Sequence, residues 1–174
     1  REILNVPNNY EVLFLQGGAS LGFLTAAYNL MGKKKTGGYL VTGAWAKKAA
    51  KEASFMGNSF NVASSEDKNF NYIPKNYQLP GDADYLHITS NNTIFGTQIK
   101  EYPNCGDVPL ICDMSSDIFS KPVDVSKFAM IYAGAQKNMG PAGVTLVIIK
   151  KDMYDKVAER HIPTMMKYKI HADN

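Results

Sequence analysis

The stretch that decides the fold reads IYAGAQKNMGPAGVTLVII, from Ile131 to Ile149. Apolar, partly β-branched runs begin and end it, and a segment rich in Gly and Ala lies between them. Such runs are typical of buried strands, and the segment between them is typical of a loop. The stretch therefore predicts two strands joined by a loop that carries Lys137. A loop lysine is usually a solvated charge, but in a suitable pocket it acts as a nucleophile.

The rest of the chain alternates apolar runs with helical patterns. We expect the strands over residues 10–15, 37–43, 58–65, 84–90, 108–116, 127–134 and 142–150. We expect the helices over residues 21–31, over 44–57 with Gly57 as the terminating residue, and from 151 onward. Residues 65–80 are polar and predict a long surface connection. This alternation is typical of a three-layer α/β/α domain around a mostly parallel sheet.

Composition narrows the class of protein. The 174 residues are 45% hydrophobic and 20% charged, the balance of a globular domain. The net charge of +3 is small and its lysines are dispersed, so we expect no nucleic-acid partner. No apolar run approaches the ~20 residues that cross a bilayer, so we expect no membrane anchor. Cys105 and Cys112 lack metal-ligand spacing, which favours free thiols in a reducing compartment such as the cytoplasm.

A turn of small residues, Gly17–Ser20, separates the first expected strand from the first expected helix. Two interpretations remain open. The backbone N–H groups and the helix N-terminus can bind an anion such as a phosphate. Alternatively, the segment is a plain tight turn in which Ser20 caps the helix.

Asp113 and Lys137 follow two different apolar strands. Asp113 is either a turn cap or a fixed negative charge at the carboxyl end of its strand, where open α/β sheets bind ligands. Neighbouring strand ends lie ~5 Å apart. If these two strands are neighbours, both side chains reach one small ligand.

Further candidates lie at other strand ends. Trp45, the single tryptophan, is either a core aromatic or a flat surface on which a planar ring stacks. Asn91, Asn92 and Thr93 are either turn residues or hydrogen-bond donors to a ligand. His87 lies within an expected strand and has no nucleophile or metal-ligand spacing around it, so we expect a structural role.

Together these features suit one kind of ligand. A planar cofactor with a phosphate, a basic ring nitrogen and an aldehyde needs an N–H cradle, an aromatic surface, a carboxylate and an amine. The chain supplies them at Gly17–Ser20, Trp45, Asp113 and Lys137. That set describes pyridoxal 5'-phosphate held by a lysine.

Long motifs support the same interpretation. They read GGAS (17–20), GAWAKKAAKEA (43–53), NNTIFGTQ (91–98), DMSSDIFSKPVDVSKFAMIYAGAQKNMGPAG (113–143) and NVPNNYEVLFLQGG (5–18). Over nearly its whole length the sequence resembles the phosphoserine aminotransferases, a family of class V aminotransferases with the fold-type I, aspartate-aminotransferase-like architecture. One departure is Gly22, where many relatives have Gln.

The resemblance implies catalytic roles for two residues. Lys137 would bond to the cofactor aldehyde and then carry a proton between the substrate Cα and the cofactor. Asp113 would pair with the protonated ring nitrogen and keep it positive. No metal is implied.

It also implies five further cofactor contacts. Trp45 would stack on the ring, and Thr93 would hydrogen-bond its phenolic oxygen. The phosphate would be held by the backbone N–H groups of Ala19 and Ser20 and by the Gln136 side chain.

The resemblance further implies transamination between L-glutamate and 3-phosphohydroxypyruvate, which gives 2-oxoglutarate and O-phospho-L-serine in serine biosynthesis. It implies a homodimer with shared active sites. Residues 1–174 would be the large cofactor-binding domain. An N-terminal segment and a C-terminal small domain would lie outside this chain, so we expect the chain to be inactive by itself.

Overall fold

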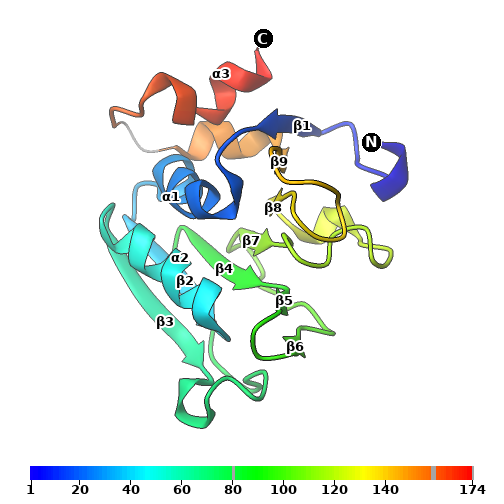
Figure 1. Cartoon of the computed structure of the whole chain (residues 1–174). Coiled ribbons are helices and arrows are strands. Elements are labelled where there is room, and N and C mark those ends of the chain that lie inside the picture. The colour runs from blue at the N-terminus through cyan, green and yellow to red at the C-terminus, as the bar shows by residue number, and fades with distance from the viewer. Residues whose placement is uncertain (80, 158–159, 174) are drawn as a thin grey trace.

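A seven-stranded sheet forms the centre of the computed structural model, which describes residues 1–79, 81–157 and 160–173 (Figure 1). The strand order is β1-β9-β8-β7-β4-β2-β3. The bounds are β1 Tyr10–Leu15, β2 Thr36–Val41, β3 Asn58–Ser64, β4 Tyr85–Thr89, β7 Leu110–Asp113, β8 Met130–Gly134 and β9 Thr145–Lys150. A separate short hairpin consists of β5 Asn91–Asn92 and β6 Thr97–Gln98. All the strands predicted from the sequence are confirmed.

The sheet is mostly parallel, with one reversed strand. The pairs β3–β2, β2–β4, β4–β7 and β7–β8 are parallel. Strand β9 runs antiparallel to both of its neighbours, β8 and β1. Six of the seven strands described in this sheet therefore end at the same edge, and the loop that contains Lys137 turns at that edge. The predicted α/β class is confirmed.

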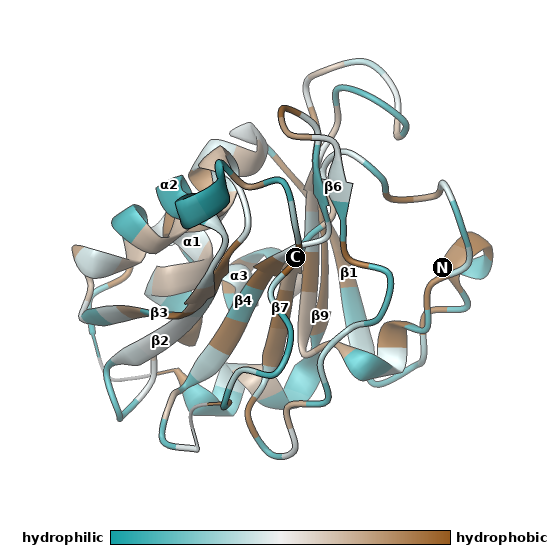
Figure 2. Cartoon of the chain, turned by 90° about the horizontal axis from the view of Figure 1, so that it is seen from below, coloured by the Kyte–Doolittle hydropathy of each residue, from teal (hydrophilic) through white to brown (hydrophobic). Residues whose placement is uncertain are grey.

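One face of the sheet carries the helices α1 Gly18–Leu30, α2 Ala44–Ser54 and the short α3 Tyr168–Ala172 (Figure 1). Helix α2 buries Ala46, Ala49 and Ala53, which lie three or four residues apart on one side. The small side chains let the helix lie close to the sheet. Figure 2 shows hydrophobic residues concentrated in the central strands beneath these helices.

The opposite face is covered differently. Its core contains Leu86, Ile88 and Ile131 from the sheet, packed against Ile99 and Ile118 from the connections. In the described residues this layer consists of loops and the 3₁₀ turns η1 Glu2–Leu4 and η3 Val125–Lys127, with no α-helix. The third layer of the predicted α/β/α arrangement is thus present, but irregular. A further 3₁₀ turn, η2 Glu66–Lys68, lies within the connection after β3.

Helix boundaries differ from the prediction at α1, which spans Gly18–Leu30 instead of residues 21–31, and at the end of α2. Helix α2 ends at Ser54, three residues before Gly57. A Cβ at Gly57 would lie 2.5 Å from Met31 Sδ and 2.6 Å from the Lys35 carbonyl oxygen, so this glycine serves close packing instead of a left-handed cap.

The predicted helix from residue 151 is a 3₁₀ segment, η4 Lys151–Lys156, in its described part, and residues 158–159 lie outside that part. It follows β9 directly, and it buries Met153 against the sheet. A last 3₁₀ turn, η5 Thr164–Met166, precedes α3.

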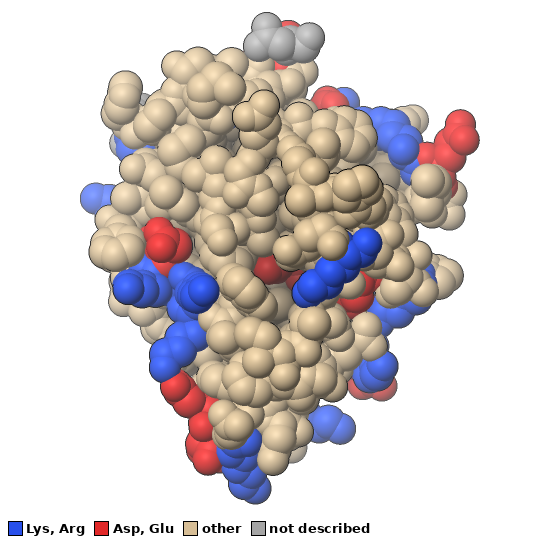
Figure 3. All heavy atoms as spheres, viewed as in Figure 1, with Lys and Arg blue, Asp and Glu red and all other residues tan. Residues whose placement is uncertain are grey.

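The surface is of mixed charge. Figure 3 shows basic and acidic side chains interspersed over the face seen there, so the net charge of +3 is not gathered into one basic field on that face. Among the described helices, none has both the length and the apolar composition that crossing a bilayer requires. Cys105 is half-buried and Cys112 buried, and neither forms a disulfide, as predicted.

Replacing Ile111 by alanine tests the central packing. Ile111 is 0% exposed in β7 and packs in the core beneath the helices. We expect Ile111→Ala to lower the free energy of unfolding by about 2–5 kcal/mol, because it leaves a cavity in the core. Urea unfolding of the full-length protein measures this. Ile3, which is 82% exposed, gives a matched control: Ile3→Ala should change the value by less than about 0.5 kcal/mol.

Candidate active site

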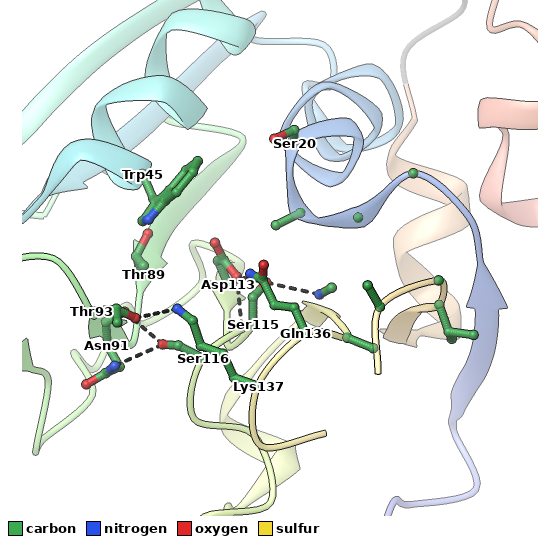
Figure 4. A pocket seen from close by; sticks show the side chains of 18 residues that line it. Ser20, Trp45, Thr89, Asn91, Thr93, Asp113, Ser115, Ser116, Gln136 and Lys137 are labelled. Atoms are coloured by element: carbon green, nitrogen blue, oxygen red, sulfur yellow. Dashed lines mark hydrogen bonds between the residues drawn. The ribbon is translucent and has the colours of Figure 1, made fainter. Parts of the chain in front are cut away.

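A cavity of about 340 Å³ opens at the edge where the parallel strands end. Its walls come from the segments after β1, β2, β4, β7 and β8 and from the segment before β9 (Figure 4). All seven residues to which the family resemblance assigns a role line it: Ala19, Ser20, Trp45, Thr93, Asp113, Gln136 and Lys137. Side chains up to 118 residues apart in sequence therefore face one space.

Asp113 is the last residue of β7 and is only 4% exposed. Its Oδ1 accepts hydrogen bonds from the Ser115 N–H at 2.9 Å and from the Ser115 hydroxyl at 2.5 Å. Oδ2 has no hydrogen-bond partner within the described chain. Asp113 is therefore a turn cap through one oxygen, and its other oxygen remains available to a ligand.

Burial governs the ionisation of this carboxyl. Desolvation raises the pKa of Asp113 to about 6, although the bonds from Ser115 act to lower it. The nearby carboxyl of Asp117 raises this pKa further, and the Lys137 ammonium lowers it. A cation bound beside Asp113 would stabilise the ionised carboxylate.

Lys137 lies in the loop after β8, and β8 pairs directly with β7, the strand that ends at Asp113. Its side chain is exposed, and its Nζ donates a hydrogen bond to Thr93 Oγ1 at 2.6 Å. Figure 4 shows the side chain of Lys137 extending toward Thr93. The amine is thus both open to solvent and directed by a specific partner.

Helix α1 presents its N-terminus to the cavity. The helix begins at Gly18 after Gly17, whose φ of 102° suits glycine. Of the two interpretations of this turn, the one in which Ser20 caps the helix is wrong, because Ser20 lies inside the first turn and no side chain caps α1. The first intrahelical bond is from the Leu21 N–H to the Gly17 carbonyl. The N–H groups of Gly18, Ala19 and Ser20 therefore have no acceptor within the helix, which is how helix N-termini bind anions.

Gly134 sets the distance between this helix and the sheet. A Cβ at Gly134 would lie 2.6 Å from the Ala19 backbone nitrogen, closer than any real contact. Only glycine at the end of β8 lets the start of α1 rest on the strand that leads to Lys137. Gly22 has a similar role one turn later, where a Cβ would lie 2.9 Å from the ring of Tyr132.

Trp45 extends from the first turn of α2 into the cavity and is half-buried (Figure 4). Lys48 lies 4.4 Å from the ring centroid, in a cation–π contact. The ring is therefore partly packed against its own helix and partly available to a ligand. Its helix is held close to Asn92: a Cβ at Gly43 would lie 2.2 Å from Asn92 Oδ1.

Asn91, Asn92 and Thr93 do not share one role: Asn92 is structural, whereas Asn91 and Thr93 are placed to contact a ligand. Asn92 is buried and donates to Thr42 Oγ1 at 3.1 Å, which is a structural role. Asn91 and Thr93 line the cavity. Asn91 Nδ2 also donates to Ser116 Oγ at 2.9 Å, which joins the end of β4 to the turn after β7.

His87 has the structural role that the sequence suggested. It is 1% exposed, its Nε2 lies 2.8 Å from the Tyr132 hydroxyl, and burial lowers its pKa to about 3. It therefore stays neutral. Among the described residues, no group of three or more His, Cys, Asp and Glu side chains is placed to hold a metal.

Several lining residues were missed by the sequence analysis. They are Thr89, Ser115, Ser116 and the segment 142–144. Ser115 had a usable signal, because a serine two residues after an aspartate commonly bonds back to it. Thr89 had none, since a threonine inside a buried strand has the same pattern whether or not it faces a cavity.

The residues fit the planar cofactor that the sequence analysis expects. Unpaired N–H groups of α1 suit its phosphate, and the free oxygen of buried Asp113 suits a cationic ring nitrogen. The Lys137 amine is within the same cavity. A strongly buried carboxyl and an amine that face one space can together bind and react with an aldehyde-bearing heterocycle.

Asp113→Asn tests the cost of burying this carboxyl. Its pKa in the folded protein, about 6, exceeds the ordinary 3.8, so folding favours the protonated form. This contribution to stability is present at pH 4 and lost as pH rises through 6, where ionised Asp113 costs roughly 3 kcal/mol. In the cofactor-free protein we expect Asp113→Asn to raise the free energy of unfolding at pH 8 and to change it little at pH 4.

Asp124 offers the matched control. It also accepts the N–H and hydroxyl of a serine two residues later, Ser126, but it is exposed and its pKa is lowered. Asp124→Asn should therefore destabilise the protein slightly at pH 8. Urea unfolding at both pH values measures the two variants, and equal effects of the same sign would contradict the prediction.

Comparison with known proteins agrees with this geometry. The family model described as Aminotransferase class-V matches residues 1–174. A phosphoserine aminotransferase of Bacteroides thetaiotaomicron is 56% identical over 174 residues, which are 100% of this chain and 48% of that protein. The chain spans about half the length of the curated relatives it matches.

Solved structures show the same fold. A phosphoserine aminotransferase of Bacillus circulans subsp. alkalophilus superposes with a TM-score of 0.94 at 47% identity, over 99% of this chain and 48% of that one. A PLP-bound phosphoserine aminotransferase of Trichomonas vaginalis superposes with a TM-score of 0.92 at 38% identity, over 100% of this chain and 52% of that one. The fold, the cavity at the carboxyl ends of the strands and the matched family model lead to one conclusion: this chain belongs to the class-V aminotransferase family.

Proposed function

We propose that the protein containing this chain is a pyridoxal-phosphate-dependent aminotransferase. It exchanges an amino group between L-glutamate and 3-phosphohydroxypyruvate and gives 2-oxoglutarate and O-phospho-L-serine, in serine biosynthesis. The observation that carries the proposal is the placement of the Lys137 amine and the buried Asp113 carboxylate in one cavity, on neighbouring strand ends. The names of the relatives support the choice of substrates.

Asp113 would keep the ring nitrogen of the cofactor protonated. When bound, pyridoxal phosphate supplies an aldehyde and a ring that accepts electrons from the substrate Cα. The free oxygen of Asp113 would accept a hydrogen bond from the ring N–H⁺, and the resulting charge pair would keep both groups ionised. This role also gives the free oxygen of the buried carboxylate a cationic hydrogen-bond donor.

Lys137 would act first as a nucleophile and then as a base. Its amine would hold the cofactor covalently through the aldehyde carbon, with loss of water, and would serve as the base that moves the proton at the substrate Cα. Thr93 Oγ1, which accepts a hydrogen bond from Nζ at 2.6 Å, would orient the amine and would hydrogen-bond the phenolic oxygen of the cofactor.

The other lining residues would bind the cofactor. The N–H groups of Ala19 and Ser20, with the positive end of α1, would hold the phosphate together with the Gln136 side chain. Trp45 would stack on the ring from the side of α2.

The proposal extends to the whole protein. Residues 1–174 would form its large cofactor-binding domain, and the remaining half of its relatives' length would supply groups that bind the substrate carboxylate. Two copies would form a homodimer with shared active sites in the cytoplasm. On this proposal residues 1–174 alone lack transaminase activity.

A second candidate function is weaker. An α/β domain can bind a nucleotide or another phosphate through a turn such as Gly17–Ser20 without covalent chemistry. The sequence lacks a Walker lysine, and the amine of Lys137 in the cavity favours the covalent alternative. Borohydride reduction separates the two, because only the aminotransferase becomes permanently labelled with cofactor at Lys137.

Lys137→Ala tests the proposed nucleophile. In the full-length protein we expect loss of borohydride-trapped cofactor in the mass spectrum and a fall in kcat of at least about 10³-fold, because both the attachment and the proton transfer are removed. Lys127→Ala is the matched control: Lys127 lies in η3, before β8 and outside the cavity lining. If Lys137→Ala kept both the trapped mass and the turnover, Lys137 would not be the nucleophile.

A substrate comparison tests the proposed reaction. With glutamate as amino donor, full-length protein should transaminate 3-phosphohydroxypyruvate with a kcat/KM at least about 100-fold above that for hydroxypyruvate, since two or more charge-assisted hydrogen bonds to the phosphate would be lost. Chromatography of the amino-acid products measures both rates. Equal rates would retain an aminotransferase but exclude a phosphorylated substrate as its specific one.

A further inference from the structure

One serine joins three parts of the proposed active site. The Ser115 hydroxyl lies 2.5 Å from Asp113 Oδ1, and it accepts a hydrogen bond from the Gly134 N–H at 3.0 Å. An amide can only donate, so the single hydroxyl proton is directed to Asp113. Figure 4 shows Ser115 beside Asp113 at the base of the cavity.

The Ser115 hydroxyl takes the place of a backbone acceptor where the pairing between β7 and β8 ends. The ladder between β7 and β8 stops at the pair Asp113 and Tyr132, and Met114 N–H still bonds to the Tyr132 carbonyl at 2.9 Å. Further along β8, the Gly134 N–H has no backbone acceptor in β7. It donates to the Ser115 hydroxyl instead. The side chain therefore continues the connection between the strand of the carboxylate and the strand that leads to Lys137.

The hydrogen bond between Ser115 and Gly134 is also connected to helix α1. Gly134, which donates to Ser115, is the residue on which the Ala19 nitrogen rests. Removing the hydroxyl would leave the buried Gly134 N–H without a partner and would take one donor from Asp113. The first effect acts on the strand end against which Ala19 packs, and the second acts on Asp113. Ala19 and Asp113 are both proposed cofactor contacts.

Other titratable groups also face Asp113. They are Asp117 in the following turn, Lys137 after β8, Tyr132 on β8 and Cys112 on β7. Asp117 opposes ionisation of Asp113, and Lys137 favours it. Asp117 itself accepts hydrogen bonds from Ser90 Oγ at 2.5 Å and Gln98 Nε2 at 3.0 Å, so its own partners lie elsewhere. Ser115 is thus the direct hydrogen-bond donor to the Asp113 carboxylate in the described chain.

We propose that Ser115 is a positioning residue for transamination. Its hydroxyl holds the Asp113 carboxylate in the orientation and ionisation state that keep the cofactor ring nitrogen protonated, and it fixes that carboxylate relative to the strand carrying Lys137. This inference rests on the proposed function.

The test follows the ring nitrogen directly. Full-length protein is loaded with pyridoxal phosphate labelled with ¹⁵N in the ring, and the ¹⁵N chemical shift and the cofactor Kd are measured between pH 5 and 9. We expect Ser115→Ala to move the shift toward that of a neutral pyridine and to weaken cofactor binding about tenfold, because a charge-assisted hydrogen bond is lost. The midpoint at which affinity falls with decreasing pH should move to higher pH.

Three further variants make the outcome decisive. Ser115→Thr keeps the hydroxyl and should restore the shift and the Kd. Ser115→Cys keeps a partner for the Gly134 N–H but donates weakly, and should give intermediate values even where Ser115→Ala folds poorly. Ser126→Ala removes the equivalent serine of the exposed Asp124 turn and should behave like the parent protein.

Each result bears on one proposal. Parent-like ¹⁵N shifts and Kd in Ser115→Ala and Ser115→Cys would overturn the role of Ser115, as would a Ser115→Thr variant no better than Ser115→Cys. A parent protein that binds no pyridoxal phosphate would instead overturn the proposed function.

Discussion

The active-site cavity depends on one constraint: six strands of the described sheet end at a single edge. Parallel pairing places the residues after each strand beside one another, although they are far apart in sequence. The one antiparallel strand, β9, returns the chain from the loop of Lys137 back into the sheet. Because that loop is anchored by a buried strand on each side, its lysine is held near the end of β7.

A second feature is the unfavourable burial of a carboxyl. Asp113 lies within a packed sheet, and its pKa of about 6 shows that the folded protein resists its ionisation. Groups perturbed in this way by desolvation and by charged neighbours concentrate at functional sites. The hydrogen bonds from Ser115 and the charge of Lys137 reduce this cost without removing it. Stability is thus lower than an apolar side chain at this position would allow, and the position remains available to a cation.

Much of the fold was predictable from the sequence. Every strand of the main sheet was predicted, because continuous apolar runs bounded by Gly and polar residues are a strong signal. The end of α2 was not, since it depends on how Gly57 packs against Met31 and Lys35. The Ser20 cap, one of two open interpretations, is absent because α1 begins two residues earlier, at Gly18. The cavity residues were weak signals one by one, and only their combination, together with a family resemblance, connected them.

Two short motifs separate what the sequence determined from what only the tertiary structure decided. Asp-Met-Ser at 113–115 and Asp-Val-Ser at 124–126 form the same local turn, in which the serine N–H and hydroxyl bond to the aspartate. That turn follows from the residue types and their spacing alone. Its electrostatic consequence does not: the pKa is lowered at exposed Asp124 and raised at buried Asp113. The difference arises from desolvation, which depends on the strands and helices that surround the carboxyl and not on the three residues of the motif.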